Sequence, residues 1–233
     1  VLKIYDFPIF YFPKFSHPDP TVKRKSGLLA PSFTSNKSLG SGIEIPYFWA
    51  ISKERDLTIS PKLYQDENPL LLAEYRQDFM KSFLIVDGGL TEGYKNTSKI
   101  KTNGSRTHLF SKFGINFVNE EEKISKLEFN LQNVSNDTYL KVHDINSILA
   151  NKNMDILENS LTYDYQDKDL FFATSFSAFE DLTKENNAKF EYLFPSATFD
   201  KNLISDDKYG AFDLSSNFKV RNYEVNKQTE IFV

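Results

Sequence analysis

The sequence contains no cysteine, and this absence excludes disulfide bonds and thiol chemistry within the chain. No apolar run approaches the roughly 20 residues that a transmembrane helix needs. The net charge is only −4, so we expect no nucleic-acid partner. A hydropathy scan would therefore class the 233 residues as a soluble protein. That inference is unsafe, because the strands of a membrane β-barrel alternate in polarity and escape such a scan.

Residues with catalytic or metal-binding chemistry are few and scattered. The three histidines have no partners at metal-ligand spacing; they are His17, His108 and His143. The dipeptide His143-Asp144 could be half of an acid–base pair, but a solvated loop is the expected interpretation. We therefore expect no enzyme, no catalytic residue, no metal and no cofactor.

Two other charged groups have simple interpretations. The carboxylates of Asp164, Asp167 and Asp169 are expected on polar strand faces or in turns, although a glycosidase pair would use such groups. The short basic cluster at residues 23–25 is expected to be a solvated turn, with a lipid-phosphate site as the alternative.

What the sequence does contain is alternation of apolar and polar residues with period two. It is clearest at residues 56–64, 109–117, 127–132, 161–166 and 212–221. This pattern is typical of antiparallel strands with one apolar and one polar face. We predict an all-β fold, an antiparallel meander of about ten strands after residue 21. One continuous outer face should carry Leu57, Ile59, Leu63, Leu127, Phe129, Leu131, Phe212, Leu214, Phe218 and Val220.

Strand length and aromatic placement favour a membrane barrel over a soluble sandwich. Residues 107–118 and 206–223 are longer than ordinary strands, and a tilted membrane-crossing strand needs about 9–11 residues. Aromatic residues near predicted strand ends would form interfacial girdles. They are Tyr64, Tyr75, Phe79, Tyr163, Tyr165, Tyr192, Tyr209 and Tyr223. Residues 65–69 and 119–123 read as turns, 93–106 and 144–159 as longer loops, with a possible helical turn at 145–149.

The stretch from residue 7 to residue 49 is the most distinctive. Two short apolar strands in it carry internal prolines, Pro31 and Pro46. Proline cannot donate a ladder hydrogen bond and is confined to edges or bulges of sheets. The sequence therefore predicts a weakly paired seam at these two strands.

Several motifs in this region occur together in one known family. They are PIFYFP at 8–13, KSGLLAP at 25–31, IPYFW at 45–49, DLTISP at 56–61 and EYR at 74–76, with a looser VSNDTY at 134–139. In order and spacing this set resembles the outer-membrane lipopolysaccharide-assembly protein LptD family. The resemblance implies an internal fragment: residues 1–20 would end a periplasmic β-jelly-roll domain, and residues 21–233 would open a large transmembrane β-barrel. Residues 1–5 do not resemble a secretory signal peptide, which the fragment interpretation also requires.

The resemblance further implies a function and partners. The family is not enzymatic; it inserts lipopolysaccharide into the outer leaflet of the Gram-negative outer membrane. It receives the lipid from an LptA-type periplasmic bridge protein and works with an LptE-type plug lipoprotein. Outer-membrane lipid is the remaining partner, and the N-terminal end is periplasmic. Pro31 and Pro46 would lie at the lateral-gate seam, and Pro18 and Pro20 at the hinge between the domains.

Two alternatives remain open at this point. The first is a soluble, secreted β-sandwich that binds carbohydrate. The second is a fragment of a passive porin or receptor barrel.

Overall fold

The computed structural model describes residues 2–4, 7–10, 24–37, 39–93, 104–120, 122–206, 208, 210–223 and 228–232. The first two segments form a separate two-stranded sheet, β1 (Leu2–Ile4) and β2 (Phe7–Phe10), in which Pro8 pairs with Lys3. The predicted hinge residues, Pro18 and Pro20, and also His17, lie outside the described residues.

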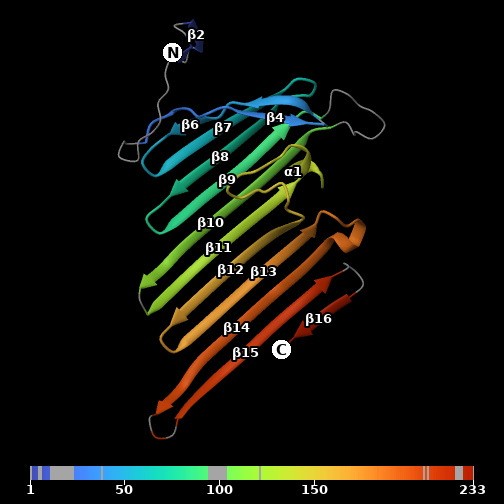
Figure 1. Cartoon of the computed structure of the whole chain (residues 1–233). Coiled ribbons are helices and arrows are strands. Elements are labelled where there is room, and N and C mark those ends of the chain that lie inside the picture. Colours follow the sequence, from blue (N-terminus) through green and yellow to red (C-terminus); the bar gives the residue numbers. More distant parts are fainter. Residues whose placement is uncertain are drawn as a thin grey trace.

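The rest of the fold is one large antiparallel sheet of 14 strands (Figure 1). The first half consists of β3 (Gly27–Leu28), β4 (Ser32–Asn36), β5 (Gly40–Glu44), β6 (Tyr47–Ala50), β7 (Arg55–Tyr64), β8 (Leu70–Asp78) and β9 (Ser82–Thr91). The second half consists of β10 (Arg106–Glu120), β11 (Lys123–Val134), β12 (Ile156–Asp167), β13 (Leu170–Asp181), β14 (Phe190–Asp206), β15 (Gly210–Tyr223) and β16 (Gln228–Phe232). From β7 onward each strand pairs with its neighbours in sequence, which makes a meander. The all-β antiparallel prediction is confirmed.

The predicted number of about ten strands is too low. The first two strands are each interrupted: β3 and β4 are the two halves of the first strand, and β5 and β6 are the two halves of the second. In addition, the connections along one edge are very short: residues 51–54, 79–81, 121–122 and 168–169. The opposite edge carries the predicted turn 65–69 and the longer connections 135–155 and 182–189. This alternation of tight and long connections agrees with the sequence.

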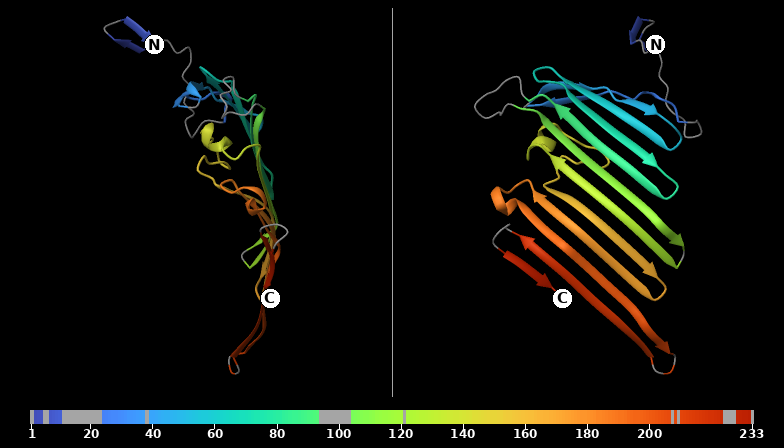
Figure 2. Two further views of the ribbon diagram at one scale, coloured as in Figure 1. Left: turned by 90° about the vertical axis from the view of Figure 1, so that its right-hand side faces the viewer. Right: turned by 180° about the vertical axis from the view of Figure 1, so that it is seen from behind.

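The sheet is a single layer in its described residues. Seen on edge in Figure 2, it is one curved sheet, and the segment around helix α1 (Tyr139–Val142) protrudes from one side only. The 3-10 helix η1 (Asn186–Lys189) is the other short helix. No helix in the described part of the chain is long and apolar enough to cross a membrane.

The two faces of the sheet differ in chemistry, as the alternation predicts. Pairing registers place Leu57, Tyr75, Val86, Ser111 and Leu131 in one row across five strands. A second row joins Leu127, Tyr163, Thr174, Ala197 and Phe218. By these registers and strand alternation, all ten predicted outer residues lie on one face. No second sheet covers that face among the described residues.

Large apolar side chains on this face remain exposed. Examples are Leu63, Leu71, Leu90, Leu109, Phe129, Leu161, Phe176 and Leu214. An exposed apolar surface of this extent marks contact with a partner or a membrane. Of the predicted girdle residues, Tyr75, Tyr163, Tyr165 and Tyr192 share this apolar face. Tyr64 and Tyr223 lie on the polar face instead, because their strand positions have the opposite parity.

The hydrophobic core lies on the polar face, beneath the connection 135–155. It consists of Leu70, Phe110, Val134, Tyr139, Leu140, Ile145, Ala150, Leu157 and Leu182. The expected helical turn at 145–149 is wrong in position: the helix is α1, and the connection begins directly after Val134. We call residues 135–155 the inner loop.

Candidate functional site

The two predicted seam prolines lie where the first strands are interrupted. Pro31 separates β3 from β4, and Pro46 separates β5 from β6. The halves pair crosswise, β3 with β6 and β4 with β5. Between the pairs Leu28–Tyr47 and Ser32–Glu44, three residues of the first strand face two of the second. The seam therefore contains a bulge beside Pro31.

Pro46 removes a hydrogen bond between the first two strands. The Leu29 amide donates to the Pro46 carbonyl oxygen at 2.8 Å. In an antiparallel ladder such a pair normally exchanges two bonds. Pro46 has no N–H to return, so this pair keeps a single bond.

A third proline, Pro61 in β7, weakens the next pairing in the same way. The Ile45 amide donates to the Pro61 carbonyl oxygen at 3.1 Å, and Pro61 cannot donate back. The alternation of residues 56–64 hid this role, because Pro61 simply takes one apolar position in it. The equal spacing of Pro31, Pro46 and Pro61 in the sequence was the available signal. We call these three residues the proline band.

Pro31 lies in the first strand, next to the edge that no described strand covers. It directly precedes Ser32, which pairs with Glu44 on β5. Pro31 has no N–H to donate to a strand on either side. The proline band thus leaves one backbone donor missing in each of the first three strands.

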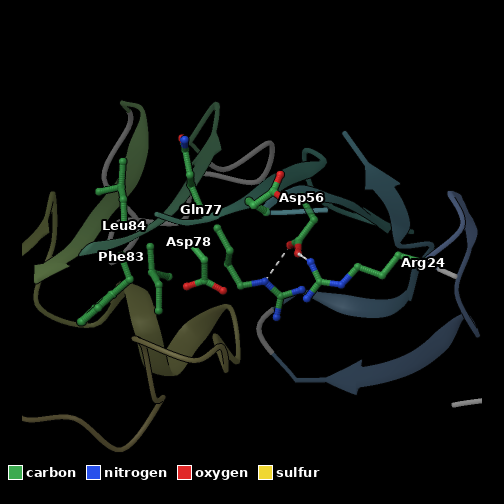
Figure 3. Close-up of a pocket in the computed structure, with 9 residues that line it drawn as sticks. Arg24, Asp56, Gln77, Asp78, Phe83 and Leu84 are labelled. Carbon is green, nitrogen blue, oxygen red and sulfur yellow. Dashed lines mark hydrogen bonds and ion pairs between the residues drawn. The ribbon is translucent and has the colours of Figure 1, made fainter. Parts of the chain in front are cut away.

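Side chains partly replace these missing bonds near β3. The Ala50 amide donates to Ser26 Oγ at 3.0 Å. Arg24 Nη1 lies 3.0 Å from Asp56 Oδ2, and Arg76 Nε lies 2.7 Å from Asp56 Oδ1. Asp56 is buried between the two guanidinium groups (Figure 3). The basic cluster is therefore not simply a solvated turn: Arg24 fastens the first strand to β7 and β8, while Lys23 lies outside the described residues.

The cavity beside this ion pair has a volume of about 310 Å³. Its charged lining consists of Arg24, Arg76, Glu54, Asp56 and Asp78. Because carboxylates outnumber the arginines, the cavity does not favour an anionic ligand such as a lipid phosphate.

The inner loop is fixed to the polar face by a buried polar network. Tyr139 Oη lies 3.2 Å from His108 Nδ1, and His108 Nε2 lies 3.4 Å from Asp87 Oδ1. Ser147 Oγ donates to the other oxygen of Asp87. The serine contacts the aspartate and not the histidine, so this is not a nucleophilic triad.

His143 is buried, which contradicts the expectation of a solvated dipeptide. Its ring packs 5.0 Å from the Tyr139 ring, centroid to centroid. Burial first, and then the positive charges of Lys62 and Arg106, lower the pKa of His143 to about 4. Burial raises the pKa of Tyr139 above its usual range. His143 therefore stays neutral at neutral pH and acts as part of the packed core of the loop.

Asp144 is partly exposed and pairs with Lys152 at 2.8 Å, which lowers the pKa of its carboxyl. Within the described residues, no group of three or more acidic, histidine or cysteine side chains is arranged to hold a metal ion. Of the predicted carboxylates, Asp164 and Asp167 lie on β12 and Asp169 lies in the turn that follows it. Asp167 pairs with Lys123 of the neighbouring strand β11 at 3.5 Å.

Comparison with known proteins gives one consistent name. The chain is 28% identical over 172 residues to the LPS-assembly protein LptD of Nitrosococcus oceani, covering 71% of this chain and 21% of that protein. It is 27% identical over 170 residues to the protein of the same name from Legionella pneumophila strain Paris, covering 70% and 20%. It is 41% identical over 76 residues to that of Pseudoalteromonas translucida, covering 33% and 10%.

The chain thus spans about a fifth of the length of the first two of these curated relatives. No family model matches the chain.

Proposed function

We propose that this chain is part of an LptD-like outer-membrane protein that inserts lipopolysaccharide into the outer leaflet. Similarity to three proteins named for LPS assembly supports the lipid as substrate. The sheet would then be the opening section of a transmembrane β-barrel, with the apolar face toward lipid and the polar face toward the lumen. The edge with short connections would face the periplasm, as in other outer-membrane barrels.

The two faces suit the two parts of the substrate. Lipopolysaccharide has a large polar sugar portion and apolar acyl chains, so it needs a wet and an apolar environment at once. The polar face would line a wet passage for the sugars, while the acyl chains leave sideways into the membrane. Such an exit requires two strands to separate, and unpaired backbone groups in lipid cost several kcal/mol each.

The proline band is the observation that carries this proposal. It lies in the first three strands, beside the uncovered edge, and leaves fewer hydrogen bonds to break when these strands separate. An ordinary structural barrel gains nothing from donors missing in three successive strands. We therefore assign Pro31 and Pro46 to the lateral-gate seam, with Pro61 as a third member of the same weak zone.

The proposal includes partners and a location. An LptA-type bridge protein would deliver the lipid to the periplasmic N-terminal end, and an LptE-type lipoprotein would occupy part of the lumen. Residues 1–20 would connect the periplasmic domain to the barrel, with Pro18 and Pro20 as the hinge. The activity is transport and not catalysis.

Replacing both seam prolines tests the proposal in the full-length parent protein. In Pro31→Val/Pro46→Val, each restored bond contributes about 0.5–1.5 kcal/mol. Two bonds shift an opening equilibrium by roughly tenfold, since about 1.4 kcal/mol corresponds to a factor of ten. We expect the variant to fold and insert, yet to deliver lipopolysaccharide to the cell surface several-fold more slowly.

Pro69→Val is the matched control, because Pro69 lies in the turn before β8 and outside the proline band. It should deliver the lipid at the wild-type rate. Normal delivery by a folded and inserted double variant would contradict the gating role of the two prolines.

A further inference from the structure

A row of polar side chains runs directly beside the proline band, on the inner face of the first strands. The pairing registers place Ser32 of β4, Glu44 of β5 and Lys62 of β7 side by side. Ser32 directly follows Pro31, Lys62 directly follows Pro61, and Glu44 lies two residues before Pro46. The row therefore crosses the same three strands that contain the proline band.

Lys62 is the buried centre of this row. Its side chain is only 8% exposed, and its Nζ lies 3.3 Å from Glu44 Oε2. A buried ammonium group is stable only when charged or polar partners surround it. Glu44 in turn accepts a hydrogen bond from Ser32 Oγ at 3.5 Å, which carries the contact to the edge strand.

The second partner of Lys62 comes from the inner loop. Lys62 Nζ donates to the carbonyl oxygen of Asp144 at 3.3 Å. Asp144 has a positive φ of 51°, a conformation that aspartate tolerates better than most residues. This turn follows α1 and is closed by the Ile145 amide, which donates to the Leu140 carbonyl oxygen at 3.0 Å.

The inner loop is anchored independently of Lys62. Its apolar side chains Leu140 and Ile145 are buried in the core, and Ser147 bonds Asp87 on β9. The loop therefore presents the Asp144 carbonyl oxygen from a fixed position. Beside it, the loop and β4 line a hollow of about 440 Å³ that includes Phe33, Ser35 and Asp144. The loop thus lies directly behind the edge strand without filling the space against it.

We propose that Lys62 couples the docked inner loop to the first strands and so positions the seam in its closed state. One acceptor of the Lys62 ammonium group, the Asp144 carbonyl oxygen, belongs to the loop, and the other, the Glu44 carboxylate, belongs to β5. We call Lys62 with these two contacts the clasp. The clasp compensates for the donors missing from the proline band while the loop is docked. When the loop undocks, Lys62 loses the Asp144 acceptor and keeps only Glu44, so the first strands are no longer connected to the loop through this side chain. This role rests on the proposed function for its purpose, but the coupling itself is a property of this fold.

Distance measurements in the purified full-length parent protein test the coupling directly. Spin labels at Ser35 on β4 and Asn153 on the inner loop would report on the gap between the edge strand and the loop; both positions are exposed. Lys62→Met removes the clasp, and Glu44→Gln removes its charge partner with almost no change of shape. We expect both variants to widen the distance distribution at least twofold relative to the wild type.

Glu128→Gln is the matched control, because Glu128 pairs with Lys126 at 2.9 Å on the same face of β11, away from the seam. It should leave the distribution unchanged. If Lys62→Met fails to fold, Glu44→Gln decides the question alone. An unchanged distribution in folded Glu44→Gln overturns the coupling.

A second measurement separates this inference from the proposed function. Cells that carry Glu44→Gln should become at least fourfold more sensitive to a large antibiotic that an intact outer membrane excludes. If the distances widen while neither this sensitivity nor lipid delivery changes, the coupling stands and the gating function fails. If the proline variant slows delivery while the distances stay unchanged, the function stands and the clasp is wrong.

Discussion

At the scale of single residues, Pro31 and Pro46 could be singled out from the sequence. Each interrupts a short apolar strand, where a residue without an N–H group is unusual. Pro61 could not be identified in this way, because it occupies a regular apolar position of an alternating strand. Its significance depends on the register that places it opposite Ile45. His143 was missed for a related reason. A histidine in a polar connection gives no sign of burial until the connection is seen to fold back onto the sheet.

The burial of His143 predicts a pH dependence of loop docking. The undocked loop should bind a proton near pH 6.5, whereas the docked loop does so only near pH 4. Docking is therefore fully favourable above about pH 6.5 and weakens as the pH falls toward 4. The charged groups and the histidine around His143 are Lys62 of β7, Glu67 of the turn before β8, and Arg106 and His108 of β10. The rings of Tyr64 and Tyr139 also pack against it. At pH 5 the docked state should lose about 2 kcal/mol, from about 1.4 kcal/mol per pKa unit.

Hydrogen exchange of the peptide covering residues 136–150, corrected for the intrinsic pH effect, measures this loss. The variant His143→Gln cannot titrate and should show a nearly flat profile between pH 5 and 7.5. Equal protection of the wild-type loop at both pH values would contradict the argument.

At the scale of elements, the strands of the sheet could be predicted and the inner loop could not. Period-two alternation assigns both the strands and their faces, because the polarity of each position follows the environment on each side. The loop contains no comparable period. Its buried residues Tyr139 and Leu140 are separated from Ile145 by a mostly polar stretch. They share one buried cluster with Leu70 and Phe110 of distant strands.

Two adjacent glycines of β9 test how closely the loop is packed. A Cβ atom at Gly89 would lie 2.6 Å from His108 Cε1 and 2.7 Å from Tyr139 Oη. At Gly88 the nearest atom, the His108 carbonyl oxygen, would be 3.6 Å away, an ordinary contact. Gly89→Ala should therefore push the loop off the sheet, whereas Gly88→Ala should not.

Limited trypsin digestion measures the difference, because the loop contains Lys141 and Lys152. We expect cleavage within the loop to be about tenfold faster in Gly89→Ala, which corresponds to about 1.4 kcal/mol of docking free energy. Indistinguishable digestion of the two variants would show that the loop tolerates the added methyl group.

At the scale of the whole molecule, the sheet is one layer with an apolar face and two edges. We expect such a sheet to be unstable alone in water, because its apolar face and its edge donors and acceptors need partners. The sequence predicted both faces correctly. It could not specify what pairs with the two edges, because alternation reports the two faces of a strand and not its neighbours.

The full-length parent should therefore partition with membranes and require detergent for extraction. Lipopolysaccharide added to the purified protein should bind, whereas a soluble glycan without acyl chains should bind at least tenfold more weakly. Detergent phase separation and a binding titration with both ligands measure these properties. A monodisperse parent in buffer without detergent would favour a soluble carbohydrate-binding protein instead.

The meander order has a consequence for how such a protein is assembled. When two strands that are neighbours in sequence pair, only the short loop between them is closed. The entropic cost of closing a loop grows with the logarithm of its length, so these pairings cost the least. In the proposed barrel the edge at β3 and β4 would be paired by a strand distant along the parent chain, so that contact should form late in folding. The junction that is proposed to open for each lipid would then also be the last one made when the barrel is built. Donors missing from the proline band would ease its opening and, for the same reason, delay its first closure.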